Sequence, residues 1–183
     1  MKYCQECGTA LTEKELEHEG VVPFCPKCRD YRFPMYNVAV SMIVINEENR
    51  KILLVKQYCK DYFRLVAGYV NRTETLEHAA VRELKEETGM TAERIRFNRT
   101  RFFEPSNTLM CNFTVFVKND RELNPNYEID SCAWFSFDDA RRNTDPKTLA
   151  GQFLNEYLDD LTESGALQAA ATASCTGRDP LMI

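Results

Sequence analysis

The hydrophobic positions of the chain fall into short apolar runs separated by polar turns. The segments 37–45 (NVAVSMIVI) and 51–58 (KILLVKQY) are rich in β-branched and apolar residues, which is typical of buried strands. The segment 62–70 (YFRLVAGYV) predicts a third strand that stops near Gly68. Similar runs predict further strands at 94–103, 108–117 and 131–137.

The pattern changes to a helical period at residues 74–89 (ETLEHAAVRELKEETG). Thr73 is the expected N-cap of this helix, and Gly89 suits the position just after its end. A short helix is expected to begin at DDARR (138–142), and 146–161 has the period of a longer amphipathic helix. The order of predicted elements is strands, one helix, further strands and then helices. This order predicts an α+β fold, with a mixed sheet covered by helices.

Composition and charge place the chain among ordinary globular proteins. Its 183 residues, 44% hydrophobic and 28% charged, suit one medium domain with a small attachment. The net charge of −5 disfavours broad binding to nucleic acid or anionic membranes. No apolar run reaches the roughly 18 residues of a membrane span, and the start MKYCQECGTA has no secretory signal. We therefore expect a cytoplasmic protein with reduced thiols.

Four of the eight cysteines form two close pairs. Cys4 with Cys7, and Cys25 with Cys28, each enclose two residues, and seventeen residues separate the pairs. This spacing is typical of a four-cysteine zinc site, in which two knuckle-like turns complete a tetrahedron of thiolates. A closed site of this kind is structural and would fold about thirty residues that are too short to fold alone. The alternatives are two disulfides, which the compartment disfavours, and a redox CxxC, which leaves the second pair unexplained.

The cysteine spacing and the strand pattern divide the chain into three parts. A zinc ribbon is expected at 1–33, the main domain at 34–162 and a weakly patterned tail at 163–183. The ribbon's intervening loop carries four glutamates and one lysine, which disfavours phosphate contact, and His18 within it is expected to be solvated. The other cysteines are scattered, and those in apolar runs are expected to be small buried side chains rather than nucleophiles: Cys111 and Cys132.

Three carboxylates gather near the end of the main predicted helix. From the helical period, Glu86 lies about 60° to one side of Glu83 and Glu87 about 40° to the other. Like charges at these spacings repel by about 0.2–0.5 kcal/mol per pair, and carboxylates are unfavourable at the negative end of a helix dipole. A site for a hard divalent cation offsets this cost, because oxygen ligands suit Mg²⁺ or Mn²⁺. A solvated acidic face is the alternative.

The flanks of these carboxylates resemble the signature of the Nudix hydrolase family. Gly68 is followed after five residues by Glu74, and after seven more by the run 82–90 (RELKEETGM). The resemblance implies a Nudix-type α/β/α sandwich over roughly 36–161, and a hydrolase that cleaves diphosphates with Mg²⁺ or Mn²⁺. In this family the carboxylates that bind the metal correspond to Glu83, Glu86 and Glu87.

The same resemblance implies roles for further residues. The carbonyl of Gly68 would add a metal ligand, and Arg82 with Glu74 would orient the metal-binding carboxylates, although a surface salt bridge is the alternative for Arg82. The segment NYEIDSCAWFSF is similar to the part of the family in which a glutamate precedes a strand. It points to Glu128 as a further metal ligand or general base, with Glu104 as the weaker rival.

A zinc ribbon ahead of such a domain is similar to the NADH pyrophosphatase group, as well as to smaller ADP-ribose and FAD hydrolases. That group carries the array SQPWPFPxS, whereas this chain has TRFFEPSNTLM (100–110) and lacks the Pro-Trp-Pro core. Phe102 or Phe103 can stack on a nucleotide base, or both can be core strand residues. The implied activity is hydrolysis of NAD(H), ADP-ribose or a related nucleoside diphosphate derivative, with release of AMP.

Two other functions stay open at this stage. A Nudix-fold sensor would bind a nucleotide without cleaving it, and the intact set of carboxylates disfavours this. A hydrolase that removes an NAD cap from RNA would use the same chemistry, with a basic groove that includes Arg94, Arg96, Arg99 and Arg101, although a solvated strand edge is the simpler expectation for that row. The expected partner is a small-molecule nucleotide substrate, and no membrane partner is expected. The resemblance also suggests a homodimer.

Overall fold

The structure is a computed structural model that describes residues 2–163. The chain divides into two compact units between Tyr36 and Asn37. The predicted tail lies outside the described residues from position 164 onward, and so does Cys175. No helix within the described part of the chain is long and apolar enough to cross a membrane.

The first unit is a small antiparallel sheet with two cysteine-bearing turns. The sheet has the order β1-β2-β3, with β1 at Thr12–Leu16, β2 at Gly20–Cys25 and β3 at Asp30–Tyr31. After each cysteine pair the chain turns through a residue in the left-handed region, Gly8 with φ 70° and Arg29 with φ 58°. The Gly8 N–H donates to the Cys4 carbonyl and the Arg29 N–H to the Cys25 carbonyl, each at 2.8 Å, so both turns are closed.

The second unit is built on a mixed sheet with the strand order β7-β8-β4-β5-β9, and β6 also pairs with β4. β4 is parallel to β8, whereas its pairings with β5 and β6 are antiparallel, which confirms the predicted mixed sheet. The strands are β4 (Asn37–Asn46), β5 (Lys51–Gln57), β6 (Val66–Tyr69), β7 (Arg94–Phe103), β8 (Thr108–Val117) and β9 (Ile129–Phe135).

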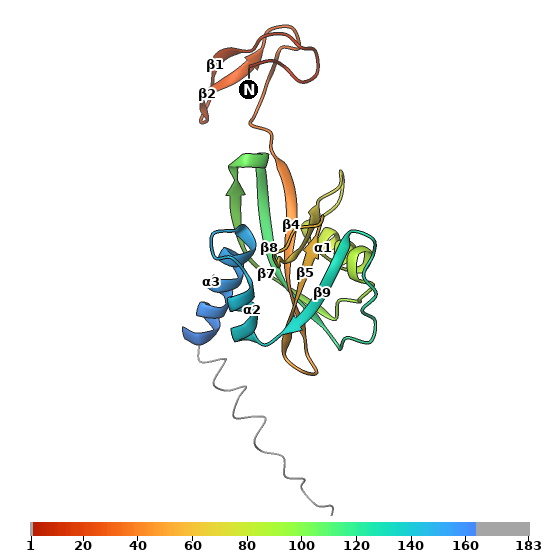
Figure 1. Cartoon of the computed structure of the whole chain (residues 1–183). Coiled ribbons are helices and arrows are strands. Elements are labelled where there is room, and N and C mark those ends of the chain that lie inside the picture. Colours follow the sequence, from red (N-terminus) through yellow and green to blue (C-terminus); the bar gives the residue numbers. More distant parts are fainter. Residues whose placement is uncertain (1, 164–183) are drawn as a thin grey trace, which may run out of the picture. The chain divides into compact units, whose positions relative to one another are not determined.

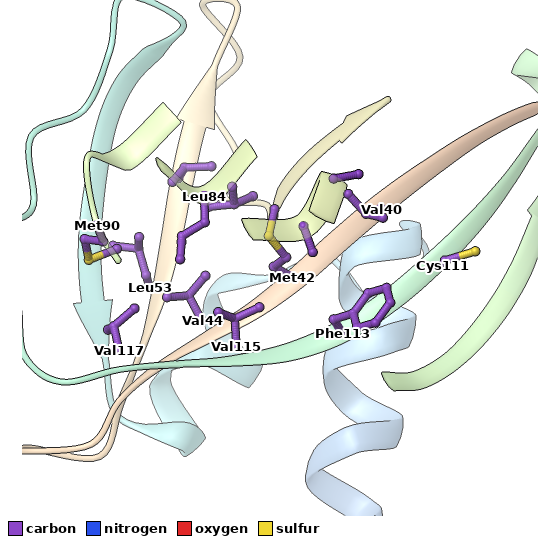
Figure 2. Packing of buried hydrophobic residues seen from close by; sticks show 14 of the residues in the cluster. Val40, Met42, Val44, Leu53, Leu84, Met90, Cys111, Phe113, Val115 and Val117 are labelled. Atoms are coloured by element: carbon purple, nitrogen blue, oxygen red, sulfur yellow. The ribbon is translucent and has the colours of Figure 1, made fainter. Parts of the chain in front are cut away.

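Helices cover both faces of this sheet (Figure 1). α1 (Leu76–Thr88) packs on one face, and α2 (Phe137–Asn143) and α3 (Leu149–Glu163) pack on the other. The central strand β4 is buried on both sides, because alternate residues enter the two cores; Figure 2 shows Val40, Met42 and Val44 with Leu84 of α1. The predicted α/β/α sandwich is therefore confirmed.

Several element boundaries differ by a few residues from the sequence-based expectation, and α1 and β6 show the physical reason. Thr73 has φ 69° and lies in the turn that precedes the helix, so it cannot provide the extended backbone that an N-cap needs. Thr75 caps α1 instead, and its hydroxyl accepts from the N–H of His78 at 3.2 Å. The third strand begins only at Val66, because the residues before it form a loop attached to β5 by a single bridge between Val55 and Arg64.

Candidate active site

The acidic end of α1 is fixed by its C-terminal cap. Gly89 has φ 73° and donates its N–H to the Lys85 carbonyl at 2.9 Å, as the sequence predicted for this glycine. The Lys85 ammonium donates to the Gly89 carbonyl at 2.7 Å, which places a positive charge at the negative end of the helix dipole. The helix therefore ends one residue after Glu87, and its last two turns carry the three carboxylates.

Arg82 is the centre of an ion-pair network at this end of the helix. Its Nε and Nη2 donate to the two carboxylate oxygens of Glu74 at 2.8 and 2.9 Å, and Nη1 donates to Glu83 at 2.8 Å and Glu86 at 2.9 Å. The fourth partner is the carbonyl of Tyr69 in β6, at 3.0 Å. This guanidinium lowers the pKa of Glu74 to about 2, so Glu74 is ionised at neutral pH and anchors Arg82. Arg82 thus joins three carboxylates and a sheet strand.

Glu83 lies directly on the backbone of β6. A Cβ atom at Gly68 would stand 1.9 Å from the Glu83 Cδ, so only glycine leaves room for this carboxylate. Burial raises the pKa of Glu83, and the Arg82 contact opposes that rise. Glu83 and Gly68 are therefore adjacent in space, although fourteen residues separate the two in sequence.

Glu87 is the most deeply buried of the helix carboxylates, at 3% exposure. Burial raises its pKa to about 8, and the charges of Glu83 and Glu128 act in the same direction. The Gln57 amide donates to its Oε2 at 3.0 Å and partly opposes this rise. The arrangement holds a carboxyl group where ionisation is unfavourable without a compensating positive charge.

Glu128 belongs to the same electrostatic environment. Its charge raises the pKa of both Glu83 and Glu87, and its backbone N–H donates to the Asn126 side chain at 2.9 Å. The structure thus places Glu128 within electrostatic reach of Glu83 and Glu87. Within residues 2–163, only the four cysteines have their possible ligand atoms close enough together to hold one metal ion. The carboxylates of Glu83 and Glu86 accept hydrogen bonds from Arg82 instead.

A pocket of about 750 Å³ opens between β6, the end of β7 and the start of α3. Phe102 and Phe103 line it, and their exposures of 51% and 38% show that they are not core residues. Glu104 also lines this pocket rather than joining the helix carboxylates. Ser41 and Ala67, which pair with each other across β4 and β6, line it from the face of the sheet that α3 covers, whereas Gly68 meets Glu83 of α1 on the other face.

The row of arginines on β7 does not form an open basic groove. Arg94 pairs with Glu47 at 2.8 Å. Arg99 and Arg101 pair with Glu156 of α3, and Arg99 also reaches Asp160. The predicted solvated edge is wrong for Arg99 and Arg101, because α3 packs close to β7 and supplies carboxylates to both.

The four paired cysteines of the first unit come together as predicted. Their sulfur atoms lie within 4.8 Å of one another, with Cys4 and Cys28 at 3.9 Å and Cys7 and Cys25 at 3.5 Å. Burial opposes ionisation of Cys4, but the Nε of Arg32, which donates to its sulfur at 3.3 Å, and further hydrogen bonds lower its pKa to about 6. Such a cluster of partly ionised thiols can hold a metal ion.

The remaining predicted residues behave as expected where the structure describes them. The His18 side chain is 88% exposed and takes no part in the cysteine cluster. Cys111 is buried in the core, Cys132 is half-buried, and burial raises the pKa of both thiols, which disfavours reactivity.

Sequence reasoning missed three residues around the site: Gln57, Tyr58 and Arg64. Gln57 ends a strand whose centre is apolar, and no motif marks it. Arg64 carried a signal, because an arginine in the run YFRLVAG stands four residues before Gly68 among apolar and aromatic neighbours. A charged residue inside such a run needs a partner or a ligand.

Comparison with known proteins gives concordant results. A model of the NUDIX domain matches residues 35–157. The chain is 27% identical over 172 residues to the NAD-capped RNA hydrolase NudC of Vibrio atlanticus (strain LGP32), covering 92% of this chain and 61% of that protein. It is 25% identical to NudC of Pseudomonas aeruginosa (strain LESB58), covering 86% and 55%. The chain therefore spans a little over half the length of these curated relatives.

Solved structures share the fold. A NUDIX hydrolase from Nitrosomonas europaea superposes with a TM-score of 0.56 at 22% identity, covering 85% of this chain and 92% of that one. The NUDIX domain of Shewanella oneidensis NrtR, complexed with ADP ribose, superposes with a TM-score of 0.58 at 16% identity, covering 75% and 94%. Because the domain match extends over most of the chain and coincides with the carboxylate-bearing helix, this protein belongs to the Nudix family.

Proposed function

We propose that this protein is a metal-dependent pyrophosphohydrolase that cleaves the diphosphate bond of NAD(H), ADP-ribose or a related nucleoside diphosphate derivative and releases AMP. The observation that carries this proposal is the set of carboxylates that Arg82 and Gly68 hold at the end of α1, in a fold that also contains a pocket lined by aromatic side chains. The first can act on a diphosphate, and the second can hold a nucleoside.

The donor set fits Mg²⁺ or Mn²⁺, both of which prefer oxygen ligands. The residues that would hold the ions are Glu83, Glu86, Glu87 and Glu128, with the Gly68 carbonyl. Glu87 supports this assignment, because burial among other carboxylates holds its pKa near 8, and a divalent cation would favour its ionised form. Bound ions of this type neutralise diphosphate oxygens and lower the pKa of a coordinated water.

The protein groups around the ions have distinct tasks. Arg82, anchored by Glu74 and the Tyr69 carbonyl, orients Glu83 and Glu86. Glu128 is close enough to influence both Glu83 and Glu87, and it serves as a further ligand or as the general base. Phe102 and Phe103 offer aromatic faces to the base of the substrate.

The names of similar proteins support the substrate class. The curated relatives are NAD-capped RNA hydrolases, and one protein of the same fold was solved with ADP ribose. Both kinds of ligand contain a diphosphate joined to adenosine. NAD-capped RNA is accordingly the second candidate substrate, although the pairing of Arg99 and Arg101 with α3 leaves that strand without a free basic row.

The cysteine cluster of the first unit is proposed to bind a structural zinc ion. A tetrahedron of thiolates with bonds of about 2.3 Å places its sulfur atoms about 3.8 Å apart, and the observed separations are 3.9 and 3.5 Å. Arg32 adds a positive charge against the Cys4 sulfur, which compensates part of the excess negative charge of four thiolates on one Zn²⁺. All four cysteines serve as ligands, so no coordination position stays open for catalysis.

The test is AMP release from NADH, NAD, ADP-ribose, FAD and an NAD-capped RNA, each with Mg²⁺ or Mn²⁺. We expect selective turnover of an adenosine diphosphate substrate, and a loss of at least about 100-fold in Glu86→Gln. Glu77→Gln is the matched control, because Glu77 is exposed in the first turn of the same helix, and it should retain turnover. Tight nucleotide binding without cleavage of any substrate would show a sensor and contradict the proposal.

A further inference from the structure

Arg64 occupies the loop between β5 and β6, two residues before the start of the strand that carries Gly68. Its backbone is fixed to β5, since the Arg64 N–H donates to the Val55 carbonyl at 2.9 Å and the Val55 N–H donates to the Arg64 carbonyl at 3.0 Å. The side chain therefore starts from a defined point on the sheet.

The guanidinium of Arg64 lies among aromatic groups rather than acids. Its Nη2 donates to the Tyr62 hydroxyl at 2.8 Å, and its Cζ lies 4.9 Å from the ring centre of Tyr62 and 6.0 Å from that of Tyr58. Within residues 2–163 no carboxylate lies within 4.0 Å of it, and its buried Nε has no hydrogen-bond partner. A buried donor of a charged group without a partner costs free energy, so this position is suited to an anionic ligand.

Arg64 faces both parts of the candidate active site. It lines the pocket together with Phe102 and Phe103. Its charge also lowers the pKa of Glu87, against the larger effect of burial, so the guanidinium is within electrostatic reach of the carboxylates. Arg64 therefore belongs to the pocket and also acts electrostatically on the carboxylate site.

We propose that Arg64 is the phosphate anchor of the pocket: it binds the phosphate of the nucleoside monophosphate half of the substrate, while the base of that half lies against Phe102 or Phe103. This inference rests on the proposed function and names the half of the substrate that the pocket takes. An arginine fork matches two phosphate oxygens at once, with Nε and one Nη as parallel donors. The partnerless Nε provides one of these donors, and the Tyr62 hydroxyl is readily exchanged for a phosphate oxygen at the other.

The test compares AMP with adenosine, which lacks only the phosphate. Calorimetric titration in Mg²⁺ is carried out on the full chain, its Arg64→Gln and Arg64→Lys variants, and Arg72→Gln as an exposed control. We expect AMP to bind more tightly than adenosine to the wild type. Arg64→Gln should weaken AMP binding by about tenfold to 100-fold, the range of a charge-assisted hydrogen bond, and leave adenosine binding unchanged. Arg64→Lys should fall between, because it keeps the charge and loses the fork.

Three results would overturn the proposal: AMP binding to the wild type no tighter than adenosine binding, AMP binding unaffected by Arg64→Gln, or an equal loss for both probes. The last would mean that Arg64 only supports the loop through Tyr58 and Tyr62. If Arg64→Gln does not fold, Arg64→Lys decides by the same comparison. Because the measurement needs no turnover, failure of the proposed hydrolysis is detected separately, in the AMP-release assay.

Discussion

The protonation state of each carboxyl group in the acidic site depends on its neighbours. Glu83 and Glu87 are buried enough for their pKa values to rise, whereas Glu74 is held ionised by Arg82. A single guanidinium thus serves Glu74, Glu83 and Glu86 and leaves Glu87 to the neutral amide of Gln57. The carboxylate without a cation of its own is the one whose ionisation depends most on an added positive charge.

This imbalance predicts a pH-dependent stability at Glu87. Its pKa of about 8 in the folded protein exceeds the ordinary value of 4.5, so the folded state holds the proton more tightly than the unfolded state. The free energy of unfolding should therefore fall as the pH rises from about 4.5 to 8 and change little above that. Glu87→Gln removes this loss. Without added Mg²⁺ or Mn²⁺ it should be more stable than the wild type at pH 8 by about 2–4 kcal/mol, with little difference at pH 5.

Urea unfolding at a series of pH values measures this difference, with Glu77→Gln as the exposed control on the same helix. Addition of Mg²⁺ should stabilise the wild type more than Glu87→Gln, because a ligand that binds only the folded state raises its stability. Parallel pH profiles for the wild type and Glu87→Gln would show that Glu87 does not carry this proton.

The sequence predicted the acidic residues of the site but not their neutral and aromatic surroundings. Glu83, Glu86 and Glu87 share a helix, so their proximity follows from a period of 3.6 residues alone. Gln57 and Arg64 meet the site across the sheet, and such contacts depend on strand register, which no local pattern fixes. Phe103 is a further example of a feature that local sequence cannot predict. Its exposure in the pocket depends on how α3 approaches β7.

At the scale of elements, strands with clear ends were predicted most accurately. β7 and β8 begin and end as expected, since the Glu-Pro-Ser turn between them stops both strands. The start of α1 was misplaced by the neighbouring threonines Thr73 and Thr75, because the sequence does not show which of them has a positive φ. The strands of the first unit were not predicted, since polar residues dominate β1.

The contact between α1 and β6 predicts the effect of a single methyl group. In Gly68→Ala the new Cβ would stand 1.9 Å from the end of the Glu83 side chain, which must move away. Because that side chain is flexible, the fold should persist with a melting temperature close to that of the wild type. Turnover should fall by about 100-fold, as expected when a catalytic group is displaced by about 1 Å.

Gly151→Ala provides the contrast in the same measurements. Its Cβ would stand 2.0 Å from the backbone carbonyl oxygen of Asp145, which cannot turn aside as a side chain can. This variant should therefore lose about 1–3 kcal/mol of stability, the usual cost of overpacking. If Gly68→Ala instead lowered the melting temperature as much as Gly151→Ala and kept its turnover, the assigned position of Glu83 would be wrong.

At the scale of the whole molecule, each of the two units is stabilised internally in a different way. The second unit has two hydrophobic cores, one on each face of its sheet. The first unit buries few apolar side chains, among them Val22, and its most enclosed residues are Cys4 and Cys25. A segment of this size without a core of its own depends on cross-links or on a metal.

This difference predicts that the two units lose structure separately. Cys25 is completely buried, so Cys25→Ser removes one ligand from the centre of the proposed zinc site. Amide hydrogen exchange of the full chain should show loss of protection within residues 2–36 and unchanged protection within 37–163, together with loss of bound zinc. Cys59→Ser is the control, because Cys59 is exposed and lies outside the cluster, and it should alter neither. Retained protection of β1 and β2 in Cys25→Ser would show that the first unit folds without the metal.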